Sequence, residues 1–162
     1  QMIKEVNAMD KILRHPDWCA QLQQEWSTKI PISQHMGINI RQYSGWRFET
    51  VAPLNANVNV HDTMFAGSIY SQATLTGWGL VWLMLKEQGL VGNIVLSKGN
   101  INYKRPVNLE PFAVAHKYRV KGSLVELLQG RNAKLEIEVD VYSGPKLAAI
   151  FSGTFVIIPV AE

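Results

Sequence analysis

The longest uncharged stretch of the chain covers residues 63–85, which is 23 residues between Asp62 and Lys86. A stretch of this length could span a membrane, since a transmembrane helix needs about 20 apolar residues. It also suits a helix that a sheet covers on nearly all sides. The stretch contains Ser, Thr and Gln side chains and three glycines, and no Lys/Arg cluster marks one end. The sequence therefore favours a buried helix and no membrane span.

Length and cysteine content indicate one cytoplasmic domain. The chain of 162 residues fits a single domain and can bury a core without disulfides. Cys19 is the only cysteine, and its neighbours Trp18 and Leu22 indicate a packed apolar side chain rather than a nucleophile. No apolar run of signal-peptide length is visible near the first residues. We therefore expect one cytoplasmic domain over residues 1–162.

The net charge of +3 is a small basic excess. Binding of nucleic acid typically needs a stronger basic bias with interleaved aromatic residues, so no nucleic-acid partner is expected. The basic residues that lie close together in sequence are Lys98, Lys104, Arg105, Lys117, Arg119 and Lys121. They would suit a rim that faces a phosphorylated or acidic partner, and a solvated strand face is the alternative.

The pattern of apolar residues predicts an α+β fold. An N-terminal helical segment is expected over about residues 5–28, interrupted at Pro16, where a second segment would begin. An Asn-rich loop over residues 54–62 precedes the central helix. That helix is expected over about residues 65–88, with Gly89 as its stop.

Strands are expected on both sides of the central helix. Two short strands fall within residues 36–53, with a turn at Ser44 and Gly45. About four strands follow the helix, among them an unbroken one over residues 112–121 and one with a bulge near Gly99. Residues 123–129 have the spacing of a short helix. This order favours an antiparallel sheet curved around one helix.

Residues 57–80, NVNVHDTMFAGSIYSQATLTGWGL, resemble a known family. Residues 63–68 and 76–79 are similar to the hotdog-fold putative thioesterase family that also occurs fused to GNAT-type acetyltransferase domains. Residues 101–107 agree with that family in layout, and the chain would be its stand-alone form. The resemblance implies a hotdog fold, a homodimer or dimer of dimers, no cofactor, and an acyl thioester of coenzyme A or acyl carrier protein as substrate.

The start of the central helix is the candidate active site. The first N–H groups of a helix have no intrahelical acceptor and lie at the positive end of its dipole. Gly67 would let a thioester carbonyl approach its N–H, and one such donor can stabilise a transition state by on the order of 3–4 kcal/mol. Tight packing of helix against sheet is the alternative role for this glycine. Asn59 is the candidate for holding a water or the acyl group.

The predicted site contains two kinds of residue. Asp62 is the only carboxylate near the helix start, so it is the candidate general base, with helix capping by it or by Thr63 as the alternative. Ser68 lacks the Gly-x-Ser-x-Gly frame of a nucleophile and is expected to hydrogen-bond the substrate. The predicted catalytic residues are Asn59, Asp62, Gly67 and Ser68, and the predicted substrate-binding residues are Asn57, Thr63, Phe65, Ala66, Tyr70 and Ser71.

Two histidines, Asn57 and Tyr70 also have structural interpretations, and the sequence shows no metal site. His61 is interpreted as a solvent-facing loop residue, and His116 as a hydrogen-bonded core residue on the apolar face of a strand. Asn57 and Tyr70 have a turn role and a core role as alternatives. No metal-ligand spacing is visible, so no metal is expected.

Residues 63–85 contain no Asp or Glu, although many hotdog thioesterases place a carboxylate on this helix. Hydrolysis would then need Asp62, a water held by Asn, or a carboxylate from elsewhere, such as Glu49 or the partner subunit. Decarboxylation of a malonyl thioester needs no base, and some members of the family are associated with it. A thioesterase is the first reading. The alternatives are a malonyl-thioester decarboxylase that feeds fatty acid synthesis and a non-catalytic acyl-binding module.

Overall fold

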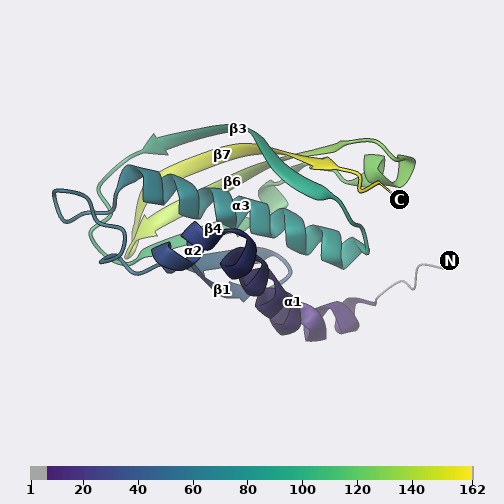
Figure 1. Cartoon of the computed structure of the whole chain (residues 1–162), viewed down its shortest axis with the longest axis horizontal. Helices are drawn as coiled ribbons and strands as arrows, with labels where there is room; N and C mark the ends of the chain where they lie inside the picture. Colours follow the sequence, from purple (N-terminus) through teal and green to yellow (C-terminus); the bar gives the residue numbers. More distant parts are fainter. Residues whose placement is uncertain (1–6, 162) are drawn as a thin grey trace.

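A curved antiparallel sheet wraps around one long helix in the computed structural model, which describes residues 7–161 (Figure 1). The α helices are α1 (Ala8–Lys29), α2 (Pro31–Met36) and α3 (Ala66–Gln88), and the 3₁₀ helices are η1 (Lys117–Arg119) and η2 (Val125–Gln129). The strands are β1 (Asn39–Tyr43), β2 (Arg47–Val51), β3 (Asn93–Tyr103), β4 (Pro111–His116), β5 (Lys121–Ser123), β6 (Ala133–Ser143) and β7 (Lys146–Ile158). The predicted α+β class and the curved sheet are confirmed.

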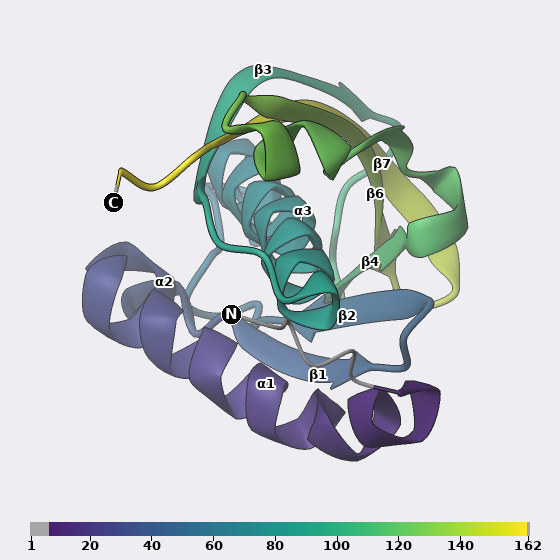
Figure 2. The ribbon, with the colours of Figure 1, turned by 90° about the vertical axis from the view of Figure 1, so that its right-hand side faces the viewer.

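The strand order β1-β2-β4-β6-β7-β3 places β1 and β3 at the two edges of the sheet, and β5 pairs with β6. Figure 2 looks along α3 and shows the sheet passing around this helix from β3 to β1. The β1 edge is partly closed by α1, because the Gln23 amide donates to the Ile38 carbonyl (3.0 Å) and accepts from the Ile40 N–H (2.8 Å). The β3 edge has no such cover among the described residues.

β3 contains the predicted bulge. Its pairing with β7 shifts register between Leu96 and Lys98. The extra residue moves the side chains that follow to the opposite face, which explains why Leu96 and Ile101 both face the core although their positions differ in parity. The expectation of a bulge near Gly99 is therefore confirmed.

α3 is buried along most of its length, as its lack of charge predicted. Leu80, Val81 and Leu83 have no exposed surface. The helix begins at Ala66 and ends at Gln88, with Gly89 in the left-handed conformation (φ 64°) as its C-cap. No helix of residues 7–161 is long and apolar enough to cross a membrane.

Neither Asp62 nor Thr63 caps α3, so this alternative from the sequence is wrong. The N-cap is Phe65, which makes no side-chain capping bond. Backbone hydrogen bonds to other segments hold the residues before the helix in place of a capping side chain. The Phe65 N–H donates to the Asn57 carbonyl (2.7 Å), and the Met64 N–H donates to the Val107 carbonyl (2.8 Å).

Pro16 does not interrupt the N-terminal helix. α1 is continuous from Ala8 to Lys29 with Pro16 inside it, and residues 5 and 6 of the expected segment lie outside the described residues. An internal proline costs about 3 kcal/mol. Burial of Trp18, Leu22 and Trp26 in the core offsets this cost.

The strand expected over residues 112–121 is broken after His116, where η1 begins, and β5 pairs with β6 instead of extending β4. The side of this strand that faces the core is also the opposite of the predicted one, since Ala113 and Ala115 face the core and His116 does not. Ala113 and Ala115 pair with Thr50 and Phe48, respectively, and are fully buried in the core. His116 therefore lies on the outer face of the sheet, half-buried, with its ring 5.2 Å from that of Tyr118.

We predict that Gly79→Ala destabilises the protein. A Cβ at Gly79 would lie 2.6 Å from a ring carbon of Phe48 and 2.9 Å from one of Trp26, both fully buried. The free energy of unfolding should fall by about 1–3 kcal/mol through overpacking, despite the higher helix propensity of alanine. Urea unfolding measures the change, and the exposed Gln88→Ala on the same helix is the control. A Gly79→Ala variant as stable as the original chain would contradict the close approach of helix and sheet.

Candidate active site

Two backbone donors at the start of α3 have no acceptor within the described residues. The N–H groups of Ser68 and Ile69 donate to the Phe65 carbonyl at 2.9 and 3.1 Å. The N–H groups of Ala66 and Gly67 make no such bond within residues 7–161. They lie at the positive end of the dipole of a 23-residue helix. A carbonyl oxygen that gains negative charge would be stabilised there.

A crevice of about 410 Å³ opens beside Gly67. We call it the Gly67 crevice. Its lining residues are Ile32, His35, Met36, Ala56, Asn57, Phe65, Gly67, Ser68 and Ser71, from α2, the loop before α3 and the first turns of α3. Five of the ten predicted site residues are therefore together: Asn57, Phe65, Gly67, Ser68 and Ser71.

Phe65 lies over Gly67, which explains what the glycine accommodates. A Cβ at Gly67 would lie 2.5 Å from the Phe65 ring. The closest neighbour of Gly67 is thus the exposed Phe65 ring at the crevice rather than a side chain of the sheet. The Ser71 hydroxyl donates to the Gly67 carbonyl (2.9 Å), whereas the Ser68 hydroxyl has no partner among the described residues. Ser68 is therefore the hydroxyl of this pair that remains available to a ligand.

Asn57, which lines the crevice, carries a buried acceptor without a partner. Its side-chain nitrogen donates to the carbonyls of Met36 and Pro53, both at 2.8 Å, which fixes the orientation of the amide. Its Oδ1 is buried and has no partner. Leaving such an acceptor unpaired costs about 1–3 kcal/mol. A hydrogen-bond donor that reached Oδ1 would remove this cost.

Among the described residues, His35 is the only ionisable side chain that lines the Gly67 crevice. The sequence reasoning missed it because residues 31–36 were not expected to form a helix. The signal was present, since Pro31 at the first helical position and Gly37 in the left-handed conformation (φ 71°) mark the two ends of α2. α2 places this imidazole opposite the start of α3.

A second crevice, also of about 410 Å³, lies on the other side of the helix start. We call it the Arg105 crevice. Its lining residues are Asn59, Thr63, Met64, Ala66, Ile69, Tyr103, Lys104, Arg105, Pro106 and Val107. The Tyr103 hydroxyl donates to the Ala66 carbonyl (2.9 Å), and burial raises the pKa of Tyr103, which keeps this donor protonated.

Asn59 uses its amide to shape the loop before α3. Its Nδ2 donates to the Thr63 hydroxyl (2.9 Å), and its Oδ1 accepts from the N–H groups of His61 (2.8 Å) and Thr63 (3.2 Å). The side chain is thus largely engaged within the loop. Its contribution to the Arg105 crevice is to position the backbone that enters the helix.

Asp62 and Tyr70 line neither crevice. Asp62 is exposed, with a left-handed backbone (φ 60°). Tyr70 packs edge-on against Phe151, 5.3 Å between ring centroids, with its hydroxyl against Gly99. Glu49, the alternative carboxylate, is ion-paired with Arg47. No Asp or Glu of residues 7–161 lines either crevice.

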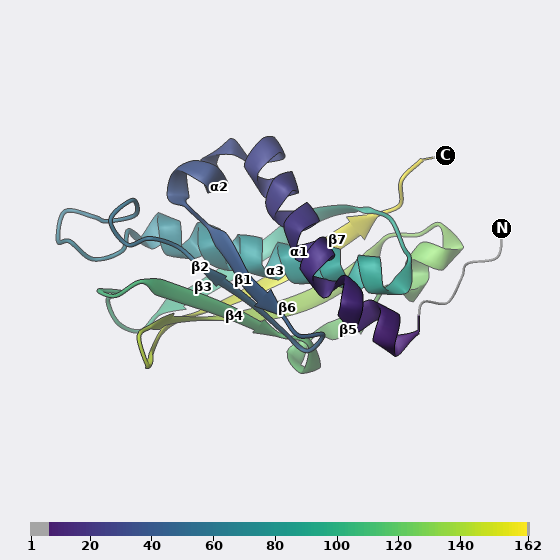
Figure 3. The ribbon, with the colours of Figure 1, turned by 90° about the horizontal axis from the view of Figure 1, so that it is seen from below.

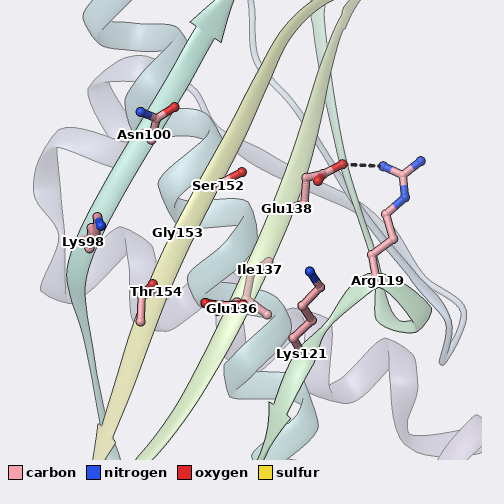
Figure 4. Close-up of a pocket in the computed structure, with 10 residues that line it drawn as sticks. All are labelled: Lys98, Asn100, Arg119, Lys121, Glu136, Ile137, Glu138, Ser152, Gly153 and Thr154. Carbon is pink, nitrogen blue, oxygen red and sulfur yellow. Dashed lines mark hydrogen bonds and ion pairs between the residues drawn. The ribbon is translucent and has the colours of Figure 1, made fainter.

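The six basic residues that the sequence places close together are divided among three sites. Lys98, Arg119 and Lys121 line a concavity of about 260 Å³ on the sheet (Figure 4), where Arg119 binds Glu138 at 3.1 Å. Lys117 pairs with Glu87 near the other end of α3. Only Lys104 and Arg105 reach the start of α3. No group of three or more potential metal ligands occurs in residues 7–161.

Residues 19–159 match the model of a family described as "Putative thioesterase (yiiD_Cterm)". The fold is similar to that of a putative thioesterase from Shewanella oneidensis, with 38% identity and a TM-score of 0.83 over 89% of this chain and 99% of that chain. It is also similar to a protein of unknown function from Chlorobaculum tepidum TLS, with 29% identity and a TM-score of 0.79 over 90% and 98%. A thioesterase from Haemophilus influenzae, 22% identical, has a similar fold, with a TM-score of 0.68 over 89% and 92%.

We predict that Asn57→Asp destabilises the protein in a pH-dependent way. A carboxylate would face two carbonyls without a donor, and the free energy of unfolding at pH 7 should fall by about 3 kcal/mol or more. Burial would raise the pKa of the new carboxyl above its unfolded value. The loss relative to the original chain should therefore shrink as the pH falls through that pKa. Urea unfolding at pH 7 and pH 4 measures it, with the exposed Asn55→Asp as the control. Equal losses in both variants would contradict the fixed amide orientation.

Proposed function

This chain belongs to the putative thioesterase family, and we propose that it hydrolyses acyl thioesters of coenzyme A or acyl carrier protein at the start of α3. The hotdog fold expected from residues 57–80 is confirmed, since the solved thioesterases that the chain resembles share it. The observation that carries the proposal is the unpaired N–H of Gly67, a residue that lines a crevice together with Asn57, whose Oδ1 is buried and unpaired.

In this proposal the Gly67 N–H binds the thioester carbonyl oxygen. As water adds to the carbonyl carbon, the oxygen gains negative charge and the hydrogen bond strengthens. A preorganised donor of this kind stabilises the transition state by about 3–4 kcal/mol. The helix dipole acts in the same direction.

The attacking water would be held by Asn57 and deprotonated by His35. Asn57 Oδ1 accepts a hydrogen bond from the water, and the His35 imidazole takes its proton as the new carbon–oxygen bond forms. The carbon–sulfur bond then breaks, and the leaving thiolate receives that proton. Asp62, the base expected from the sequence, is not assigned this role because it lies outside both crevices.

The absence of carboxylates from both crevice linings favours malonyl-thioester decarboxylation as a second candidate. A malonyl carboxylate would meet no negative side chain there. The bond to the departing carbon dioxide breaks, and its electron pair forms an enolate whose oxygen the Gly67 N–H stabilises. Protonation of the enolate carbon then gives the acetyl thioester. No general base is needed in this route, which would feed fatty acid synthesis.

We predict that His35→Gln separates the two reactions. If the protein is a hydrolase, kcat/KM should fall by about 10²–10⁴-fold, because the general base is lost. Acetyl, malonyl and longer acyl thioesters are incubated with the protein, and free thiol and carbon dioxide are followed separately. His61→Gln, in the exposed loop, is the control.

The outcomes assign the function. Thiol release that His35→Gln abolishes supports the hydrolase. Carbon dioxide release with the thioester intact, at a rate that His35→Gln leaves unchanged, assigns the decarboxylase. Binding without either product leaves an acyl-binding module.

We further propose a homodimer, or a dimer of dimers, that joins β3 edges, in a cytoplasmic enzyme of fatty acid metabolism. β3 is an 11-residue edge strand that pairs only with β7 among the described residues. An open edge of this length presents a row of unpaired N–H and C=O groups. Pairing of two copies through β3 would satisfy them.

Light scattering should then give a mass of two or four times the 18.2 kDa of the chain. Hydrogen exchange provides the structural test. In a monomer, alternate β3 amides point to solvent and exchange rapidly, whereas pairing protects all of them. The amides of β6, which is bonded on both sides, are the internal reference. A monomeric mass with alternating protection in β3 would exclude this dimer.

A further inference from the structure

A third concavity at this end of the molecule, of about 540 Å³, adjoins the Arg105 crevice. We call it the cationic groove. Its lining residues are Lys104, Arg105, Pro106, Asn108, Leu109, Ser143, Pro145 and Lys146. Lys104, Arg105 and Pro106 line both hollows. A path therefore leads from the start of α3 to the turn between β6 and β7, and Figures 1 and 3 show these segments at the same end of the molecule.

The groove concentrates positive charge without compensation. Lys104, Arg105 and Lys146 are exposed, and none pairs with a carboxylate of residues 7–161. No Asp or Glu of the described residues lines the groove. The concavity on the sheet in Figure 4 differs, because Glu136 and Glu138 lie among its basic residues. Three cations around a carboxylate-free hollow favour a ligand with several negative charges.

The backbone that carries these cations is held firmly. The N–H groups of Lys104 and Arg105 both donate to the Ala148 carbonyl, at 2.7 and 3.1 Å. The Ser143 hydroxyl accepts from the N–H groups of Asn108 (3.1 Å) and Leu109 (3.2 Å) and donates to Asn108 Oδ1 (3.0 Å). A fixed frame lowers the ordering cost of binding. The groove is therefore a preformed feature of the fold.

The groove extends away from the thioester site along β7. Tyr103, whose hydroxyl reaches the Ala66 carbonyl, pairs with Ala149 in β7. Lys146 precedes Ala149 by three residues, which is about 10 Å of strand. An extended ligand with its reactive end at α3 would therefore place its distal groups among the cations.

We propose that the cationic groove binds the phosphate groups of the phosphopantetheine arm that carries the acyl thioester. The inference rests on the proposed function, which places the thioester at the start of α3. The pantetheine chain would pass from Gly67 over the start of α3 into the Arg105 crevice, and its phosphates would meet Arg105, Lys104 and Lys146. Arginine can bind a phosphate with two parallel hydrogen bonds, and lysine acts as a point charge. Coenzyme A and the prosthetic group of a carrier protein share this chemistry.

The test compares thioesters of one acyl group on four carriers: coenzyme A, 3′-dephospho-coenzyme A, 4′-phosphopantetheine and pantetheine. In the original chain KM should be at least about tenfold lower for the coenzyme A thioester than for the pantetheine thioester, and added salt should narrow the difference. In Arg105→Ala/Lys146→Ala the ratio of KM for the pantetheine thioester to KM for the coenzyme A thioester should approach one. Lys98→Ala/Lys121→Ala, which removes the same charge from the concavity on the sheet, should keep the ratio.

The four carriers and an acyl carrier protein identify the phosphate. If Arg105→Ala/Lys146→Ala raises KM only for coenzyme A thioesters, the groove binds the nucleotide phosphates. If the variant raises KM equally for phosphopantetheine and carrier-protein thioesters, the groove binds the 4′-phosphate. An unchanged ratio in Arg105→Ala/Lys146→Ala, or the same collapse in the control variant, would overturn the proposal.

Failure of the proposed function gives a separate result. If no thioester is turned over, calorimetric titration with coenzyme A and with pantetheine still measures the groove. Affinity for coenzyme A that exceeds the affinity for pantetheine about tenfold, and that Arg105→Ala/Lys146→Ala removes, supports phosphate binding without catalysis. Equal affinities in the original chain would reject it.

Discussion

Close contact between an uncharged helix and the inner face of a curved sheet is the constraint on which the rest of the structure depends. Small residues of the helix face large side chains: a side chain on Gly79 would meet Phe48 and Trp26, and one on Gly77 would meet Phe155. The charged side chain of Glu49 lies on the outer face of the sheet, where it pairs with Arg47. Burial of α3 thus depends on glycines of the helix that make room for the large side chains facing them.

The same burial creates the candidate active site. A helix enclosed along its length still needs an entry, and here the entry is fixed by tertiary hydrogen bonds rather than by a capping side chain. The Ala66 and Gly67 N–H groups consequently remain available. Two crevices flank them, one with Asn57 and His35 and one that leads to basic residues. The arrangement supplies donors and cations but no carboxylate, which suits an anionic, carbonyl-bearing ligand.

Local signals were sufficient for much of this arrangement. Gly89 as the end of α3, the turn after β1 and the bulge near Gly99 follow from residue preferences that act over a few positions. The grouping of Gly67, Ser68 and Ser71 also follows from sequence, since they lie in the first turns of one helix, whereas tertiary hydrogen bonds hold Asn57 beside them. His35 could not be placed this way, because its approach to Gly67 depends on how α2 packs.

The sequence by itself determined that a long helix is buried, that an antiparallel sheet surrounds it and that its first turn offers free donors, because charge content and periodicity are properties of the chain. Only the tertiary structure decided which polar groups meet there. It left Asp62 in solvent, engaged Asn59 within its loop and brought Arg105 beside Lys146, residues 41 positions apart in the sequence. The physical reason is that strand register and loop anchoring, such as the Ser143 contacts to Asn108 and Leu109, set these distances.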